Sequence, residues 1–426
     1  MQLKYGLNDK PGKTEMLLFG LQWLAVTIPS LIIIGDILGI FENGGIPYLQ
    51  KIFLLVGFLL LVQVLWGHRL PLVMGPAAVL LIGVLKSSDH GIGAVNSSIL
   101  IGGLILTLLA IGDYIKYLER LFTSRVIMVI LLLIAFTLTP TIINLISSAS
   151  NVPANYNFIF VIVFILIIFT THALTKGIFR SLVPLIALFL GSLVYSIIFN
   201  VSNIHNLNTA LLAFPSDFIG HLAVPDIGII IAFLISFLAL AINDISSMES
   251  VGFMLSVDKL QERVKKGIAI TGAGNFLAGL LGIIGPVNYS LSPGIIVATQ
   301  NASRFTLIPA AVGLLILAFS PVALNVLAGI PSPVIGVIFL YLMVAQIGAA
   351  MLLAVENKTL KTIDDGIIVG LPVLLGIVIA FMPQSVTAEL PLVIKPIVAN
   401  GFVMGALAVL LFEHVLYPRN TFHTEN

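Results

Sequence analysis

The sequence predicts an all-α polytopic membrane protein whose fourteen transmembrane segments form a seven-plus-seven inverted repeat. Three observations lead to this fold class. The chain of 426 residues is 59% hydrophobic and only 9% charged, whereas soluble domains carry roughly 25% charged residues. Its lysines and arginines gather on one side of the predicted membrane. Two apolar segments, one in each half, are interrupted by helix breakers.

The composition excludes several classes of protein. The mean hydropathy of +1.14 leaves no room for a sizeable soluble domain. The absence of cysteine excludes disulfides, thiolate metal sites and cysteine nucleophiles. The sequence has no phosphate-binding glycine loop, no metal-ligand spacing and no nucleophile elbow, so we expect neither an enzyme nor a cofactor. The basic residues are scattered, so we expect no nucleic-acid partner. The polar stretch 1–15 precedes a run long enough to span, so we expect no cleavable signal peptide.

The apolar runs divide the chain into segments. A full span needs about 20 apolar residues, and a half-helix needs fewer. The predicted segments cover approximately residues 16–40, 48–66, 70–86, 92–112, 125–147, 157–175, 178–199, 226–256, 267–285, 287–301, 304–328, 332–354, 363–383 and 392–416. The third and tenth are too short and too broken for ordinary helices, and we expect each to be a short extended stretch followed by a half-helix.

The distribution of lysine and arginine predicts the orientation. Only Lys51, Lys86 and Lys395 fall on one side. The other side, which includes both termini, holds Lys4, Lys10, Lys13, Arg69, Lys116, Arg120, Arg125, Lys176, Arg180, Lys259, Arg263, Lys265, Lys266, Arg304, Lys358, Lys361 and Arg419. Positive residues favour the cytoplasm, so we expect both termini there and the protein in the cytoplasmic (inner) membrane.

The two interrupted segments predict a transporter. One break lies at Arg69–Ala78 and the other at Ile284–Gly294, and both contain Gly-Pro. Irregular backbone at membrane depth survives only where it faces protein or a water-filled cavity, and transporters use such breaks to build substrate sites. Seven spans per half is an odd number, so the halves, residues 1–200 and 201–426, must have opposite orientations.

The eighth segment carries the acidic residues that lie deepest in a predicted span. A carboxylate inside a bilayer is costly and usually serves function. Asp244 and Glu249 lie about 140° apart around an α-helix, so a regular helix aims only one of them at a given site. Asp244 shares a face with Met248. The bland alternative is that either acid pairs with a neighbouring helix or meets water.

The tenth segment supplies polar groups for a ligand. Asn288, Tyr289, Ser290 and Ser292 can form hydrogen bonds, and a half-helix starting near Gly294 offers free N–H groups. The alternative is a kinked helix whose polar groups satisfy its own backbone. Elsewhere, His172 near the end of the sixth segment fits a hydrogen-bonded interfacial histidine better than a proton relay.

At these residues the chain resembles the nucleobase–ascorbate transporter family, which includes uracil and xanthine permeases. Leu21-Gln-Trp23 resembles the Gln-His element of the family, with Trp23 in the place of the histidine. The stretch Arg69–Gly75 resembles the entry to its third span, Gly294–Arg304 the stretch after its second break, and Ile330–Gly336 the start of its twelfth span. Their order and spacing extend the resemblance over nearly the whole chain.

The resemblance implies a core domain of segments 1–4 and 8–11, a gate domain of segments 5–7 and 12–14, and a homodimer. It places substrate between the two breaks and the eighth segment. Spacing assigns the family's acidic residue of that segment to Asp244, whereas the local pattern Glu249-Ser-Val-Gly252 assigns it to Glu249. Both stay open as substrate-binding and proton-coupling residues.

The chain also departs from the family at the expected site. Leu291 stands where the family has Glu or Gln, Ser292 where it often has Asn, and Ala78 where uracil permeases have Phe, whereas Tyr289 matches them. A site built on hydrogen-bonding pairs rejects ligands strongly when one partner is lost. Uracil itself is therefore in doubt. The substrate-binding residues that we expect are Asp244, Glu249, Met248, Gly75, Ala78, Tyr289, Ser290, Leu291, Ser292 and Gly294.

The function expected from these features is secondary active transport of a nucleobase (uracil, xanthine or a related base) by alternating access. We expect a proton or other cation as the coupling partner. One alternative is an anion transporter of the same fold, resembling the SulP family. Another is a non-transporting ligand sensor that keeps the fold.

Overall fold

The computed structural model confirms an all-α membrane protein, and it describes residues 3–38, 45–114, 121, 123–147, 152–200, 210–289, 292–387, 389–391 and 394–417. Within these ranges, nine helices are long and apolar enough to cross a membrane, or ten if one bent pair counts as a single span. The predicted number of fourteen is therefore not established by helix length. Each of the fourteen predicted segments nevertheless contains a helix.

The elements follow the predicted order in both halves. Those of the first half are α1 (Lys13–Ile37), α2 (Ile46–Leu65), β1 (Met74–Pro76), α3 (Ala78–Lys86), η2 (Ser88–His90), α4 (Ile92–Ile111), α6 (Ser124–Thr137), α7 (Thr139–Ser147), α8 (Ala154–Leu174) and α9 (Gly177–Phe199). Those of the second half are α10 (Ile227–Met254), α11 (Leu260–Leu281), β2 (Pro286–Asn288), α12 (Ser292–Thr299), η3 (Arg304–Thr306), α13 (Leu307–Ala318), α14 (Pro321–Ala328), α15 (Ser332–Glu356), α16 (Ile363–Ala380), α17 (Gln384–Thr387), α18 (Lys395–Val398), α19 (Gly401–Leu411) and η4 (Phe412–Leu416).

Both predicted breaks have the expected form, a three-residue strand followed by a short helix. Two other segments differ from their prediction as single spans. The eleventh bends by 93° between α13 and α14, because Ser320 caps the N-terminus of α14 and Pro321 occupies its first turn. The fourteenth is divided into α18 and α19 at Asn400, whose side chain caps the Val403 N–H.

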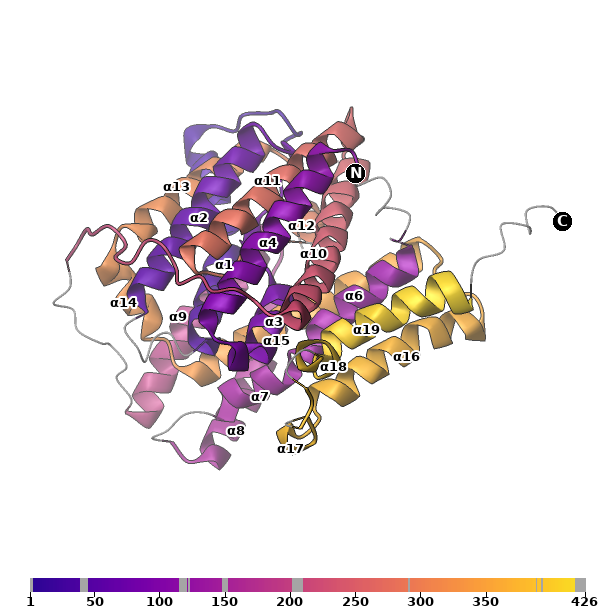
Figure 1. Cartoon of the computed structure of the whole chain (residues 1–426). Helices are drawn as coiled ribbons and strands as arrows, with labels where there is room; N and C mark the ends of the chain where they lie inside the picture. The colour runs from indigo at the N-terminus through magenta and orange to yellow at the C-terminus, as the bar shows by residue number, and fades with distance from the viewer. Residues whose placement is uncertain are drawn as a thin grey trace.

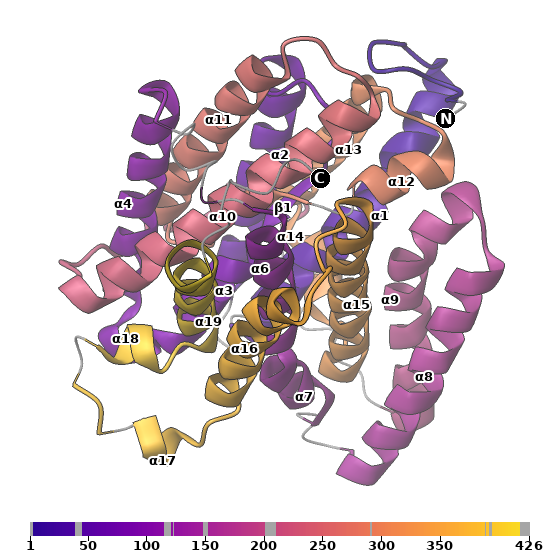
Figure 2. The same cartoon turned by 90° about the vertical axis from the view of Figure 1, so that its right-hand side faces the viewer.

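The helices pack in two groups (Figure 1). In one, α4 lies along α11 and α2 along α13, and α10 crosses α3 and α4. In the other, α6 contacts α15, α16 and α19. In Figure 2, α8 and α9 flank α15 at the edge away from α4 and α11. Helix α1 contacts α13 of the first group and both α9 and α15 of the second.

Glycine permits a close contact between α4 and α11 in the first group. A Cβ added at Gly103 of α4 would lie 2.3 Å from the backbone nitrogen of Phe276 in α11. A side chain there would separate the helices. Small residues are a usual basis of helix packing inside membranes, where apolar burial gives no driving force.

A buried ion cluster holds the second group together. Arg125 of α6 is 4% exposed and pairs with both Asp365 of α16 and Glu413 of η4. The Arg125–Glu413 separation is 2.7 Å from Nε to Oε2. Removing one member would leave buried charge uncompensated, so the cluster fixes α6, α16 and η4 relative to one another.

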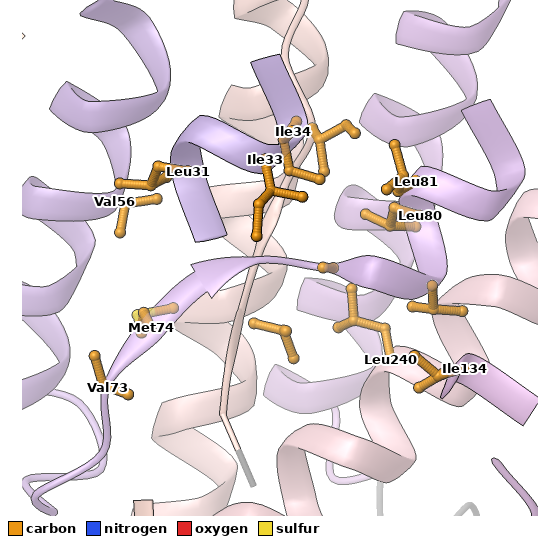
Figure 3. Close-up of a cluster of buried hydrophobic side chains, with 14 of the residues drawn as sticks. Leu31, Ile33, Ile34, Val56, Val73, Met74, Leu80, Leu81, Ile134 and Leu240 are labelled. Atoms are coloured by element: carbon orange, nitrogen blue, oxygen red, sulfur yellow. The ribbon is translucent and has the colours of Figure 1, made fainter. Parts of the chain in front are cut away.

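The apolar core surrounds the strands. Figure 3 shows Leu31, Ile33 and Ile34 of α1 above β1, with Leu80 and Leu81 of α3 beside them. Further side chains in this cluster come from α2, α6 and α10. The two short strands are thus shielded from lipid, which is the condition for extended backbone at this depth.

Candidate functional site

The site is built on the antiparallel pairing of β1 with β2. The register places Met74 opposite Asn288, Gly75 opposite Val287 and Pro76 opposite Pro286. Proline has no N–H, so the ladder weakens at the last pair. Backbone hydrogen bonds from Ala77 N to Gly285 O and from Tyr289 N to Val73 O, each 2.9 Å, flank the strands. The two breaks therefore satisfy each other's backbone groups.

Asp244 fastens β2 to α10. Its side chain is fully buried, and Oδ1 accepts hydrogen bonds from the Asn288 backbone N at 3.0 Å and from Asn288 Nδ2 at 2.7 Å. Thr271 of α11 is its other polar neighbour. No cation among the described residues pairs with this carboxylate. Asp244 is thus buried, and it holds the strand without lining either of the two cavities described below.

His68 extends this network to the first break. Its Nδ1 accepts from the Leu70 N–H at 2.9 Å, so its Nε2 carries the proton and donates to Asn288 Oδ1 at 3.3 Å. Gln63 Nε2 donates to Thr271 Oγ1 at 3.2 Å, which brings the network back to the neighbours of Asp244. A shift of either break would break several buried hydrogen bonds. Our sequence analysis missed His68, although a histidine just before a predicted break was the available signal.

Gly75 and Tyr289 fit against each other. A Cβ added at Gly75 would lie 2.1 Å from Tyr289 Oη, a distance that real atoms do not adopt. The hydroxyl donates to Pro76 O at 3.3 Å. Glycine is therefore required at position 75 by the tyrosine ring that covers it.

One cavity is lined by residues of the strand pair, and a second lies at the start of the helix that follows β2. The smaller, about 80 Å³, is lined by Ala78, Asn243, Val287 and Tyr289 among others. The larger, about 430 Å³, lies beside the start of α12 and is lined by residues of α1, α6, α8, α9, α10, α12 and α15. Both cavities reach Leu342 of α15. Cavities of 300–1,000 Å³ are typical of small-molecule sites.

A stripe of small polar residues on α10 faces these cavities. Asn243 lines the smaller one, and Ser246, Ser247 and Ser250 line the larger one. These residues share one side of the helix by their spacing, and Asp244, which lines neither cavity, lies about 60° from Ser247 around the helix. The sequence analysis missed this polar stripe, because serine is common in packed transmembrane helices.

The remaining expected site residues fall in different surroundings. Gly294 lines the larger cavity. Ser292 is fully buried, with Oγ donating to Tyr289 O at 2.8 Å and accepting from Val73 N at 3.2 Å. Met248 is also fully buried, against Gly267 of α11. Glu249 is partly exposed and has an interaction of its own. Ser290 and Leu291 lie outside the described residues.

His172 is the hydrogen-bonded histidine that the sequence favoured. It accepts from Arg180 Nε at 2.8 Å and lies 2.7 Å from Tyr341 Oη. All three side chains line the larger cavity, so a basic residue does reach the neighbourhood of the site. The sequence analysis had used Arg180 only to predict the orientation of the protein in the membrane.

Comparison with known proteins gives the family. The model of the Permease family, that of xanthine and uracil permeases, matches residues 14–385. The chain belongs to this family. The protein is therefore a transporter and not an enzyme, and the resemblance seen in the sequence is confirmed. The alternative of an anion transporter is supported only by the similarity of fold that is described below.

The curated relatives of this permease-family protein carry the names of purine and nucleobase transporters. It is 26% identical to "Putative purine permease CPE0397" of Clostridium perfringens, over 98% of this chain and 93% of that protein. It is 25% identical to the nucleobase transporter PlUacP of Paenibacillus larvae, over 94% of each chain. It is also 25% identical to the uric acid permease PucK of Bacillus subtilis, over 95% of this chain and 96% of that protein.

Solved structures confirm the inverted-repeat fold. The transmembrane domain of the cyanobacterial bicarbonate transporter BicA has a TM-score of 0.58 at 17% identity, covering 88% of this chain and 98% of that one. Murine Slc26a9 in the inward-facing state has a TM-score of 0.59 at 12% identity, covering 94% and 69%. At these identities the likeness concerns the fold alone.

Proposed function

We propose that this protein is a secondary active transporter of a nucleobase, with a purine as the first candidate, and that it works by alternating access across the cytoplasmic membrane. The observation that carries the proposal is the buried strand pair with one cavity lined by its residues and a larger cavity at the start of α12, both of which reach α15. Breaks that line cavities are the usual substrate sites of such transporters. The names of the curated relatives support purines over uracil.

We propose the division into a core domain of segments 1–4 and 8–11 and a gate domain of segments 5–7 and 12–14. The repeats 1–200 and 201–426 each contribute to both domains. The contacts of α10 with α3, α4 and β2 on one side, and of α6 with α15, α16 and α19 on the other, support it. Both cavities are lined from both domains, so movement of one domain against the other would open each in turn. Cytoplasmic termini and the homodimer belong to the same proposal.

In this mechanism the base binds beside the α10 stripe. Ser246, Ser247 and Ser250 would offer hydroxyl groups, and the backbone around Gly294 would offer further polar groups. Among the described lining residues of the larger cavity there is no carboxylate. A neutral polar wall of this kind suits a heterocycle with donors and acceptors on its edge.

Coupling to protons is assigned in this proposal to Asp244 or Glu249. Protonation of Asp244 would weaken its two hydrogen bonds to Asn288, because bonds to a charged acceptor are roughly twice as strong as neutral ones. The position of β2 would then depend on the proton. Glu249 lies one helical turn from Ser246 and could instead carry the proton at the edge of the larger cavity.

Ligand-dependent thermal stability tests the proposal. The purified protein in detergent is heated with xanthine, urate, hypoxanthine, adenine, uracil or bicarbonate. A ligand that binds only the folded state stabilises it by roughly 2.7 kcal/mol at 100 times Kd. We expect a shift with at least one purine. A shift with bicarbonate alone would favour an anion transporter. Binding of a purine without any uptake into vesicles would favour a ligand sensor.

A further inference from the structure

Three polar side chains from three different helices meet on one wall of the larger cavity. His172 of α8 accepts from Arg180 Nε of α9 at 2.8 Å, and its Nδ1 lies 2.7 Å from Tyr341 Oη of α15. The imidazole and phenol rings meet edge to face with centroids 5.5 Å apart. All three residues line the cavity. The three side chains therefore form one hydrogen-bonded cluster in the wall of the larger cavity.

The hydrogen-bond partners fix the protonation of the cluster. A guanidinium can only donate, so His172 Nε2 must be an acceptor and the imidazole must be neutral. The proton then sits on Nδ1 and is donated to Tyr341 Oη. The Tyr341 hydroxyl keeps its own proton to give to another acceptor. The terminal nitrogens of Arg180 likewise keep their protons, since only Nε is used by His172.

Arg180 gives this cavity a positive charge. It forms no ion pair with any carboxylate in the described part of the chain. It is also the only residue lining the described cavity that bears a permanent charge. The cavity is also lined by the neutral stripe of α10 that includes Ser246 and Ser250. The Arg180 side chain is exposed, so its terminal N–H groups are accessible to a ligand. A guanidinium that no carboxylate neutralises favours anions and carbonyl oxygens, which its planar fork can bind through two parallel hydrogen bonds.

We infer that Arg180 and Tyr341 form a donor site that selects purines by their carbonyl oxygens, so that urate and xanthine bind and adenine is disfavoured. This inference rests on the proposed function and deepens it. Urate carries several carbonyl oxygens and a negative charge near neutral pH, which complement donors on one wall. Adenine presents an exocyclic amino group, a donor that would face other donors. The serines of α10 that line the cavity can donate or accept, so they would tolerate either base.

The test compares urate with adenine in Arg180→Gln and in a matched control. The control is Lys176→Gln, which removes the same charge at the start of the same helix but does not line the cavity. Affinity is measured on the full chain in detergent by thermal shift and by competition binding. For Arg180→Gln we expect urate affinity to fall about ten- to a hundred-fold, because a hydrogen bond to a charged group is lost, and adenine binding to be unaffected. Lys176→Gln should behave as wild type.

A second variant keeps the test informative if Arg180→Gln folds poorly. Tyr341→Phe removes only the hydroxyl that would donate to the ligand and should lower urate affinity by a smaller factor, about three- to ten-fold.

The possible failures are distinguishable. If no purine stabilises the wild type, the proposed function itself falls. If purines bind but Arg180→Gln matches Lys176→Gln, the transporter function stands and this inference is overturned. If bicarbonate or sulfate gives an Arg180-dependent shift and no purine does, both are overturned.

Discussion

The Asp244 carboxylate provides the most detailed prediction. Its Oδ1 accepts two hydrogen bonds from Asn288 in a fully buried setting. In Asp244→Ala both donors are left without a partner. A buried donor without an acceptor costs about 1–3 kcal/mol, so the loss of unfolding free energy should be about 2–6 kcal/mol. The truncated side chain adds a small cavity cost to this.

Asp244→Asn separates the structural role from the charge. The amide carbonyl keeps both hydrogen bonds in the weaker, neutral form, which costs about 2–3 kcal/mol in total. Removing a buried charge that no cation compensates offsets much of this. We therefore expect the stability of Asp244→Asn to lie within about 2 kcal/mol of wild type. Proton-driven uptake should be lost, while binding of the base persists.

The assay combines thermal unfolding in detergent with uptake into proteoliposomes, with and without a pH gradient. Phe253→Ala, at an exposed residue of α10 that lines neither cavity, serves as the control for helix disturbance. Equal stability of Asp244→Ala and Asp244→Asn would refute the proposal that the carboxylate fastens β2. Full gradient-driven uptake by Asp244→Asn would remove Asp244 from coupling and leave Glu249 as the candidate.

Three further predictions concern Gly75, Gly348 and the ion pair of Asp89. Gly75→Ala should lose about 1–3 kcal/mol of stability by overpacking, since its Cβ would meet Tyr289 Oη; adding Tyr289→Ala should restore part of the loss in a thermal unfolding measurement. Gly348→Leu should abolish uptake without lowering the unfolding temperature, because nothing lies within 4 Å of an added Cβ and the residue lines the larger cavity. The Lys395 ammonium, hydrogen-bonded to Asp89, lowers the pKa of that carboxyl below its usual 3.8. A carboxyl whose pKa is lower in the folded state stabilises that state at any pH above its pKa in the unfolded chain. This contribution to stability, about 0.2–1 kcal/mol for an exposed pair, should therefore be constant between pH 5 and 7 and vanish only below about pH 4. It should be absent in Asp89→Asn.

Each of these has a control or a contrary result. Gly370→Leu on α16 also has open space around an added Cβ but does not line either cavity, so it should leave uptake unchanged. Loss of uptake in that variant would mean that glycine replacement alone explains the effect of Gly348→Leu. A stability gain from Gly75→Ala would contradict the close contact with Tyr289. A pH-dependent loss near pH 6 that disappears in Asp89→Asn would contradict the sign of the pKa shift.

The sequence predicted the breaks because their cause is local. Gly75-Pro76 and Gly285-Pro286 cannot continue a helix, and long apolar runs flank both. Their pairing as β1 and β2 follows from the inverted repeat. The bend before Pro321 also has a local cause, the Ser320 cap followed by proline. It was not predicted because apolar residues continue on both sides of it, so the segment read as a single span.

The direction of side chains could not be predicted. The structure buries Asp244, but the helical phase that turns it towards Asn288 and Thr271, and turns Ser246 towards the cavity, depends on which helices flank α10. The same reason applies to two other residues. Met248, which we expected in the binding site, is packed against Gly267, whereas Arg180, which we expected only as a sign of orientation, lines the cavity. Such contacts are set by tertiary packing and produce no periodic pattern that a single sequence would show.

Uptake into proteoliposomes tests the central claim most directly. The wild-type protein is reconstituted and given labelled xanthine or urate with an inward proton gradient. We predict accumulation above the external concentration, its collapse on addition of a protonophore, and its absence in Gly348→Leu. Equilibration that ignores the gradient would contradict proton coupling, and no purine uptake at all by correctly folded protein would contradict the proposed function.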